Sequence, residues 1–270
     1  MYGEETCDVA GLMVGKRCVV LGASSPRSIG WGIARALHRE GADLFFSYSS
    51  DRSKIHLDPL VDSLPGGERF PRVRCDVGRD EDVASFFRSV EAHWGGALDV
   101  LVHSVGHARA EELTGSYLDI SREGYAFAHS ISAYSLIACA REAAPLLAAG
   151  GAGSILTITY VAGQRVVPDY NVMASAKAAL ECHVRYLAAE LGSRNIRVNA
   201  ISAGPIRTLS ASAVKSLASG RRQMEERAPL RRNVDTSDVG DVALFLASDL
   251  SRCLTGEILN ADNGFHILGM

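Results

Sequence analysis

The chain is poor in lysine, has no excess of positive charge and contains no long hydrophobic run. Its 270 residues include 28 lysines and arginines against 31 acids, which gives a formal net charge of −3. Proteins that bind nucleic acid neutralise many phosphates, so this balance excludes a general nucleic-acid binder. Only four of the cations are lysine, at positions 16, 54, 177 and 215, so a lysine within a motif is informative. We expect a small-molecule or acyl substrate.

We expect no targeting or membrane-anchoring segment in this sequence. The first sixteen residues include Glu4, Glu5 and Asp8 and have no apolar core. The most apolar stretch, near 143–158, is interrupted by Pro145 and by glycines. These features predict neither a signal peptide nor a membrane span, and they favour a cytoplasmic location.

Cysteine is present but not in a pattern that holds a metal. The six cysteines lie far apart, at positions 7, 18, 75, 139, 182 and 253. Neither a CxxC pair nor a CxxC followed by histidines occurs, so no zinc site is expected. The sequence therefore predicts buried thiols in a reducing compartment.

Short apolar or β-branched runs alternate with segments of helical length along the whole chain. The expected strands are 17–21, 43–48, 70–75, 99–104, 154–160, 197–202 and 257–261, and the expected helices lie near 30–40, 53–63, 80–94, 121–148, 169–192 and 236–248. This alternation predicts an α/β protein in which one domain spans 1–270, a Rossmann-type doubly wound sheet of seven mainly parallel strands flanked by helices. Longer polar stretches follow strands four and six, at 106–122 and 203–233. Because open α/β sheets bind ligands at the carboxyl ends of their strands, we expect these stretches to form the substrate cleft.

A glycine- and serine-rich loop follows the first strand, at 22–32. Gly22 suits a tight turn, Ser28 supplies a hydroxyl, and the N-terminus of the following helix favours an anion such as a pyrophosphate. The spacing differs from GxGxxG, and a plain strand-to-helix turn is the alternative. Its place in the first βα unit favours a dinucleotide site.

Two later strand ends suit the same cofactor. Asp76 follows the third strand, where its carboxylate would accept from an adenine amino group, although a helix cap is an equal alternative. Ser104 and Gly106 follow the fourth strand, beside the expected nicotinamide ribose. The second strand ends without an acid to bind a ribose 2′-hydroxyl, while Arg52 and Lys54 lie close by. This gives a weak preference for NADPH over NADH, with a solvated helix start as the alternative.

Tyr170 and Lys177 are candidates for the chemistry. Pro168 and Asp169 are expected to start a helix, on which a spacing of seven residues places both side chains on one face, about 10 Å apart along the axis. An ammonium near a phenol lowers the pKa of the phenol, so the pair would exchange a proton near neutrality. A core tyrosine and a surface lysine are the alternative. Tyr160 ends the fifth strand, and a loop would bring both phenols into one pocket.

Several separated segments together resemble the short-chain dehydrogenase/reductase superfamily and, within it, the bacterial NAD(P)H-dependent enoyl-acyl-carrier-protein reductases. They include SIGWGIA, RCDV, VHSVG, YNVMASAKAALE, RVNAISAGPIRTL and TGEIL, within a match from about residue 14 to residue 270. The commoner members of the superfamily have a Tyr-xxx-Lys motif, which would need a tyrosine where Met173 stands. Here Tyr160, Tyr170 and Lys177 follow the enoyl reductase spacing.

The resemblance implies reduction of the trans-2 double bond of an enoyl thioester by NADH or NADPH in fatty-acid elongation. By the resemblance, Tyr170 binds the thioester carbonyl, Lys177 holds the nicotinamide ribose, and Tyr160 is a supporting phenol at the acyl site. The implied coenzyme contacts are Gly22, Ser28 and Ile29 for the pyrophosphate, Asp76 and Val77 for the adenine, Ser104 and Gly106 for the ribose, and Ile206 and Thr208 for the nicotinamide. Ala108, Tyr160 and Tyr170 are the expected substrate contacts.

The resemblance also implies partners. An acyl carrier protein would dock near 208–227, which is expected to form a mobile helix pair over the acyl chain. Its basic rim includes Lys215 and Arg221, although the arginines are also compatible with a solvated face. Relatives are usually homotetramers, which is the state we expect.

Some positions depart from the family pattern. His107 stands where an apolar aromatic is usual, which indicates a more polar or more selective pocket, and Asn263 replaces a glycine. Two alternatives to the leading function therefore stay open. One is a related oxidoreductase that acts on a specialised carrier-bound chain or on a ketone or alcohol, and the other is a catalytically silent dinucleotide-binding sensor.

Overall fold

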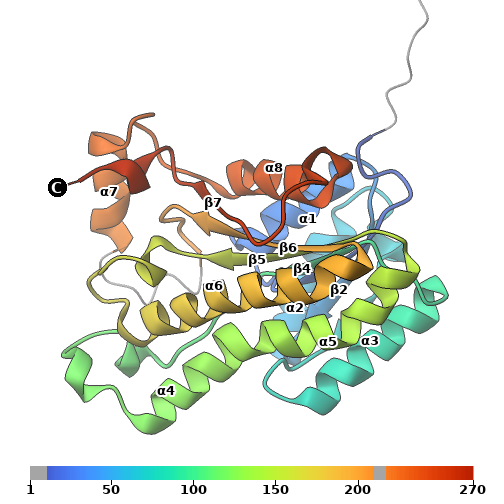
Figure 1. The fold of residues 1–270 in the computed structure, drawn as a ribbon, viewed down its shortest axis with the longest axis horizontal. Coiled ribbons are helices and arrows are strands. Elements are labelled where there is room, and N and C mark those ends of the chain that lie inside the picture. The colour runs from blue at the N-terminus through green and yellow to red at the C-terminus, as the bar shows by residue number, and fades with distance from the viewer. Residues whose placement is uncertain (1–10, 209–216, 270) are drawn as a thin grey trace, which may run out of the picture.

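A computed structural model describes residues 11–208 and 217–269 of the chain. Seven strands form one sheet, namely β1 (Arg17–Leu21), β2 (Asp43–Tyr48), β3 (Arg72–Arg74), β4 (Val100–His103), β5 (Gly153–Thr159), β6 (Ile196–Ala203) and β7 (Ile258–Ala261). Their order is β3-β2-β1-β4-β5-β6-β7, and every recorded pairing is parallel. The predicted seven-stranded doubly wound fold is therefore confirmed (Figure 1).

Helices cover both faces of this sheet (Figure 1). They are α1 (Ile29–Arg39), α2 (Asp51–Asp62), α3 (Asp80–Trp94), α4 (Arg122–His129), α5 (Ser135–Ala149), α6 (Asn171–Leu191), α7 (Leu217–Arg227) and α8 (Thr236–Ala247). Shorter helical turns are η1 (Gly67–Arg69), η2 (Ala110–Glu112), η3 (Tyr117–Asp119), η4 (Ser130–Tyr134), η5 (Val161–Gly163), η6 (Gly192–Arg194), η8 (Asp249–Ser251) and η9 (Phe265–Ile267). No helix in the described ranges is both long enough and apolar enough to cross a membrane.

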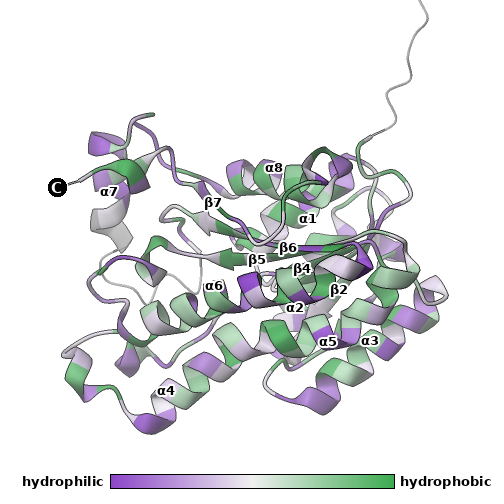
Figure 2. Cartoon of the chain, in the orientation of Figure 1, coloured by the Kyte–Doolittle hydropathy of each residue, from purple (hydrophilic) through white to green (hydrophobic). Residues whose placement is uncertain are grey.

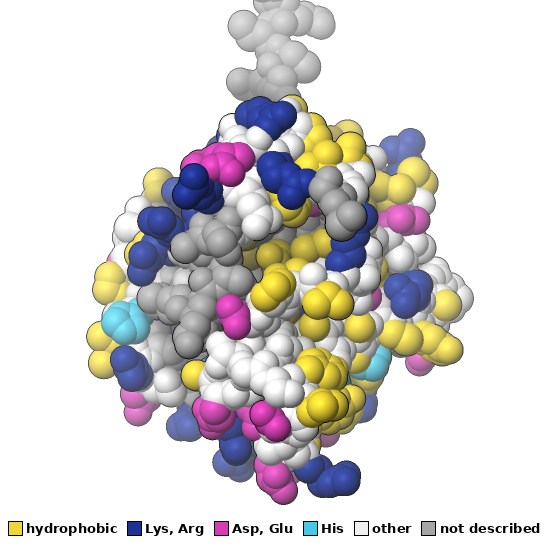
Figure 3. All heavy atoms as spheres, turned by 90° about the vertical axis from the view of Figure 1, so that its left-hand side faces the viewer, with side chains coloured by type: hydrophobic (Ala, Val, Ile, Leu, Met, Phe, Trp, Pro, Cys, Tyr) yellow, Lys and Arg dark blue, Asp and Glu magenta, His cyan; other side chains and the backbone are white. Residues whose placement is uncertain are grey.

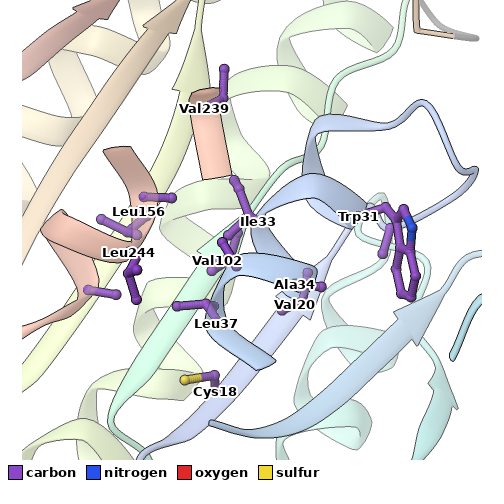
Figure 4. Close-up of a cluster of buried hydrophobic side chains, with 14 of the residues drawn as sticks. Cys18, Val20, Trp31, Ile33, Ala34, Leu37, Val102, Leu156, Val239 and Leu244 are labelled. Carbon is purple, nitrogen blue, oxygen red and sulfur yellow. The ribbon is translucent and has the colours of Figure 1, made fainter. Parts of the chain in front are cut away.

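The hydrophobic core has two halves, one on each face of the sheet. On one face, side chains of α1 and α8 meet those of β1, β4 and β5, as Figure 4 shows for Leu37, Leu244 and Leu156. On the other face, α3, α5 and α6 pack over the same strands. The central strands β1, β4 and β5 are mostly hydrophobic and buried, while the helices alternate in polarity (Figure 2), as expected for strands covered on both sides. The edge strand β3 is more polar, with two arginines among its three residues.

Close backbone approach fixes the first βα unit against its neighbours. Gly22 directly follows β1 with a φ of 90°, and a Cβ there would lie 2.0 Å from the carbonyl oxygen of Ser104, which directly follows β4. Any side chain at this position is excluded by both conformation and space. Ser28 then caps α1 by accepting from the Trp31 amide at 3.3 Å. The carboxyl ends of β1 and β4, where the strand order reverses, are thereby held together.

The prediction of a single helix over 121–148 is wrong in detail. The segment consists of α4 and α5 joined by η4, a five-residue π-helical turn at Ser130–Tyr134. A π turn inserts one extra residue, and no apolar periodicity marks it in the sequence. Ser132, within this turn, is fully buried.

Other boundaries differ for identifiable reasons. Helix α6 begins at Asn171 rather than at Pro168 and Asp169, because Asp169 has a φ of 57° and Tyr170 is the N-cap residue. Helix α2 begins earlier than expected because Ser50 and Ser53 form a capping box. Strand β3 keeps only three of its six expected residues. Helix α7 lies within 208–227, where the resemblance implied a helix pair, and positions 209–216 lie outside the described residues.

The prediction that the cysteines are buried holds for only some of them. Cys18, Cys75 and Cys139 are buried, whereas Cys182 is half-buried and Cys253 is exposed. Position 7 lies outside the described residues. Within the described ranges, no group of three or more His, Cys, Asp or Glu side chains is arranged to hold a metal ion.

Candidate active site

A cavity of about 910 Å³ runs along the carboxyl ends of the strands. Every predicted site residue lines it: Gly22, Ser28, Ile29, Asp76, Val77, Ser104, Gly106, Ala108, Tyr160, Tyr170, Lys177, Ile206 and Thr208. These residues come from the loops after β1, β3, β4, β5 and β6 and from helix α6. The fold thus brings together residues that are spread over 187 positions of sequence, because all these loops leave the same edge of a parallel sheet.

The phosphate loop is the polar end of this cavity. Ser28 donates to the Ser25 carbonyl oxygen at 2.8 Å and also caps α1. The Ser25 hydroxyl is buried and has no hydrogen-bond partner. The cavity itself is lined here by Gly22, Ser24 and Ser28 beside the N-terminus of α1, a setting that fits the phosphate of a dinucleotide.

Asp76 lies on the cavity wall and does not cap a helix. Its carboxylate accepts from the Gly78 amide at 3.0 Å, while Arg79 is the N-cap of α3 and makes no side-chain cap. The helix-cap alternative is therefore excluded. The half-buried carboxylate is accessible from the cavity.

Near the second strand, the cavity wall is formed by hydroxyl groups. Ser47, Tyr48, Ser49 and Ser53 line it. The Lys54 ammonium lies 3.1 Å from an Asp58 carboxylate oxygen on α2, so its charge is already partnered. Of Arg52 and Lys54, the two cations expected to favour NADPH, Lys54 is therefore paired with an acid of its own helix.

Tyr160 and Tyr170 meet at the other end of the cavity. Their ring centroids are 5.0 Å apart, with the planes tilted by 58°. Burial raises the pKa of both phenols, and for Tyr170 the neighbouring Tyr160 adds to the effect. The expectation that an ammonium lowers the pKa of Tyr170 is wrong for this state, because desolvation of the phenolate outweighs any attraction by Lys177.

Lys177 is buried beside them, with 6% of its surface exposed. Its Nζ donates to the Ile158 carbonyl oxygen near the end of β5 at 2.7 Å. Burial lowers the pKa of Lys177 to about 8, against an opposing effect of Glu181. An ammonium has three donors, so two remain for a ligand in the cavity.

The loop after β4 is held by the π turn. The Ser132 hydroxyl donates to the His107 carbonyl oxygen at 3.0 Å and accepts from the His107 amide at 2.9 Å. The His107 ring then packs edge-on against Phe127 of α4, with centroids 5.6 Å apart. The Arg109 guanidinium also lies over the Phe127 ring, 5.4 Å from its centroid. The polar wall expected from His107 is thus joined by the Arg109 guanidinium.

Sequence reasoning missed several residues of this site. Phe127 and Ile131, which line the cavity, and Ser132, which holds the His107 backbone, come from the segment that was expected to be one regular helix, and nothing in the sequence marks them. His103 was noted only as part of a strand end. Its buried ring lies between the Thr157 hydroxyl at 3.0 Å and the Ser135 hydroxyl at 2.8 Å, and burial lowers its pKa to about 3.

Comparison with known proteins identifies the family. The family model described as enoyl-(acyl carrier protein) reductase matches residues 22–266. The chain belongs to the enoyl-(acyl carrier protein) reductase family. It is 48% identical to enoyl-[acyl-carrier-protein] reductase [NADH] FabI of Bacillus cereus over 258 residues, 96% of this chain and 99% of the relative. The corresponding Bacillus subtilis protein is 47% identical over 253 residues, which cover 94% of this chain and 96% of the relative.

Solved structures of the family have the same fold as this reductase. The Bacillus cereus enzyme with NADP+ and indole naphthyridinone superposes with a TM-score of 0.93 at 47% identity, covering 96% of this chain and 100% of that chain. The Anaplasma phagocytophilum enzyme in complex with NAD gives a TM-score of 0.91 at 42% identity, with 97% of each chain covered.

Proposed function

We propose that this reductase reduces the trans-2 double bond of an enoyl thioester with a reduced nicotinamide coenzyme, as a step of fatty-acid elongation. The observation that carries the proposal is the arrangement of Tyr160, Tyr170 and Lys177 on one wall of a cavity that begins at the phosphate loop. The overall change is enoyl thioester, NAD(P)H and one proton to acyl thioester and NAD(P)+.

The residues along the cavity fit a dinucleotide. Gly22, Ser28 and Ile29 would hold the pyrophosphate, Asp76 and Val77 the adenine, and Ser104, Gly106 and Lys177 the nicotinamide ribose. Ile206 and Thr208 would contact the nicotinamide. When bound, the dihydronicotinamide supplies the hydride that reaches the β-carbon of the substrate.

Tyr170 would act as a hydrogen-bond donor rather than as a phenolate. Its raised pKa keeps the hydroxyl protonated at neutral pH, so the proton is available to the thioester carbonyl oxygen. Negative charge develops on that oxygen as the enolate forms, and a donor already in place stabilises it. Tyr160 would support the orientation of the Tyr170 ring, and Ala108 would contact the acyl chain.

For the coenzyme, the weak sequence preference for NADPH is not confirmed. Two of the relatives compared above are named as NADH enzymes, although one family structure contains NADP+. Lys54 is engaged with Asp58, which leaves Arg52 as the cation in favour of a 2′-phosphate. We therefore propose NADH as the preferred coenzyme.

The remaining assignments also belong to the proposal. An acyl carrier protein would deliver the substrate over 203–233, and the enzyme would work in the cytoplasm as a homotetramer. Lys215 lies outside the described residues. On α7, Arg221 donates to the Pro205 carbonyl oxygen and Arg222 pairs with Glu226 at 2.7 Å, so these two arginines are partly engaged. The face in Figure 3 mixes basic, acidic and apolar side chains.

A specialised enoyl chain is the second candidate substrate. It is favoured by His107 and Arg109, which make part of the cavity wall polar and cationic.

The test follows nicotinamide absorbance with crotonyl and longer enoyl thioesters, each with NADH and with NADPH. A ketoacyl thioester is the control substrate. We expect the enzyme to oxidise NADH in the presence of the enoyl thioesters and not in the presence of the ketoacyl thioester. Turnover of the ketoacyl thioester, with none of the enoyl substrates, would contradict the proposal.

A further inference from the structure

Glu181 is a buried carboxylate that the proposed chemistry does not use. It lies on α6 one helical turn after Lys177, and only 4% of its surface is exposed. Acidic side chains are almost never this buried without a partner. Among the residues that the structure describes, Asp99 has Arg17 as an ionic partner, whereas Glu181 forms no ion pair within 4.0 Å. Its position therefore needs another explanation.

The carboxylate is bound by the segment that leads from β5 toward the two tyrosines. Its Oε1 accepts from the Thr159 hydroxyl at 2.8 Å, and its Oε2 accepts from the Gln164 amide at 3.0 Å. Between these donors, η5 packs so closely that a Cβ on Gly163 would lie 2.9 Å from Oε1. Helix α6 thus holds both ends of the turn that begins directly after Tyr160.

Lys177 holds the same segment one residue earlier. Its Nζ binds the Ile158 carbonyl oxygen, so Ile158, Thr159 and Gln164 are all attached to one face of α6. Two residues four apart on a helix share a face, which is why one acid and one base reach the same strand end. Because Tyr160 lies between Thr159 and Gln164, these hydrogen bonds hold the backbone that carries Tyr160 against α6.

Glu181 is also the acid whose charge acts on Lys177. Burial lowers the pKa of Lys177 to about 8, and the negative charge of Glu181 opposes that change. His103 of β4 is close enough for the Lys177 charge to act on it, and the phenols of Tyr160 and Tyr170 line the same cavity as Lys177. His103 has a pKa lowered to about 3 and the phenols have raised pKa values, so all three are neutral near pH 7.

We propose that Glu181 is a positioning residue of the reductase. It fixes residues 158–164, here called the Tyr160 segment, to α6, and its negative charge keeps the Lys177 side chain protonated for coenzyme binding. The kinetic part of this inference rests on the proposed function. The coenzyme-binding part does not need an enoyl substrate.

The first experiment measures coenzyme affinity against pH for the full-length wild type and for Glu181→Gln. The probe is NADH, titrated by fluorescence between pH 6 and 9.5. Lys177 loses its proton as pH rises through about 8, so wild-type affinity falls on the alkaline side. In Glu181→Gln the loss begins at lower pH, because the opposing charge is gone. We expect affinity within about twofold of wild type at pH 6 and about tenfold weaker at pH 8.5.

Two further variants separate charge from attachment. Glu190→Gln removes an exposed acid from the same helix and should match wild type at every pH. Gln164→Met removes one hydrogen bond to Glu181 and keeps its charge, so the pH profile of NADH binding should stay at the wild-type position. Its kcat with crotonyl thioester should fall about three- to tenfold, because the Tyr160 segment is less well fixed.

The outcomes that would overturn the inference are distinct from failure of the proposed function. Identical pH profiles of NADH affinity for Glu181→Gln and wild type would contradict the proposed effect of the Glu181 charge on Lys177. If Glu181→Gln does not fold, the wild type alone gives the test: an NADH affinity that is constant from pH 7 to 9.5 would contradict the same proposal. A wild-type kcat in Gln164→Met would contradict the proposal that attachment of this segment to Glu181 matters for turnover. Absence of enoyl reduction by the wild type would contradict the proposed function and leave the binding result standing.

Discussion

At the scale of single residues, the site depends on a phenol that its surroundings keep protonated. Tyr170 is packed against Tyr160, and its pKa is raised by burial and by that neighbour. A neutral phenol donates a hydrogen bond but cannot remove a proton. This makes Tyr170 suited to stabilising negative charge on an oxygen, which is what hydride addition to a conjugated thioester requires.

Tyr170→Phe is expected to lower enoyl reduction by about two orders of magnitude or more, because it removes the donor to the developing enolate. NADH affinity should stay within about twofold of wild type, since the phosphate loop is untouched. Steady-state kinetics and fluorescence titration measure the two quantities. Tyr186→Phe, an exposed tyrosine of α6, is the matched control. Undiminished turnover in Tyr170→Phe would refute the assigned role.

At the scale of elements, the π turn η4 connects a helix of the core to the loop that lines the cavity. Its Ser132 hydroxyl accepts from the His107 amide and donates to the His107 carbonyl oxygen, and the Met173 sulfur lies 3.4 Å from the same oxygen atom. Met173 stands on α6, one turn before Lys177. One hydroxyl therefore joins the loop after β4, the α4–α5 segment and helix α6, which carries Lys177.

Ser132→Ala is expected to destabilise the protein by about 1–2 kcal/mol, since it leaves two backbone groups of His107 without their partner. The KM for an enoyl thioester should rise several-fold, while NADH affinity changes little. Chemical denaturation and steady-state kinetics are the measurements. Ser85→Ala, on the exposed side of α3, should leave both unchanged. An unaltered KM in a destabilised Ser132→Ala protein would show that the turn has a purely structural role.

At the scale of the whole molecule, the cavity joins loops from both halves of the sheet. A ligand that contacts the loops after β1, β3, β4 and β6 stabilises them together, because unfolding must release it. At a concentration of 100 times Kd, one bound coenzyme adds about 2.7 kcal/mol to the free energy of unfolding.

Saturating NADH is therefore expected to raise Tm by about 5 °C or more, as followed by calorimetry. Lys177→Ala should show a smaller increase, because it loses the donor expected at the ribose. An equal Tm with and without NADH and NADPH would contradict a dinucleotide site in this cavity.

Much of this arrangement is predictable from local patterns. The seven strands, the helix that carries Lys177 and the glycine turn after β1 follow from hydrophobic alternation and from residue types that act over a few positions. The signals that failed are those without a local pattern. Neither the π turn at Ser130–Tyr134 nor the left-handed Asp169 before α6 changes the apolar periodicity. Glu181 could have been noticed, because it follows Lys177 at the spacing that shares a helix face.

The sequence by itself determined the order of strands and helices, the parallel sheet and the residue types available for chemistry, because these depend on periodicity and on side-chain identity. Only the tertiary structure decided the protonation of Tyr170 and His103, the attachment of Glu181 to the Tyr160 segment and the hold of Ser132 on His107. The reason is that desolvation and hydrogen bonding between distant segments depend on which groups exclude water from one another. That is settled only when the chain has packed.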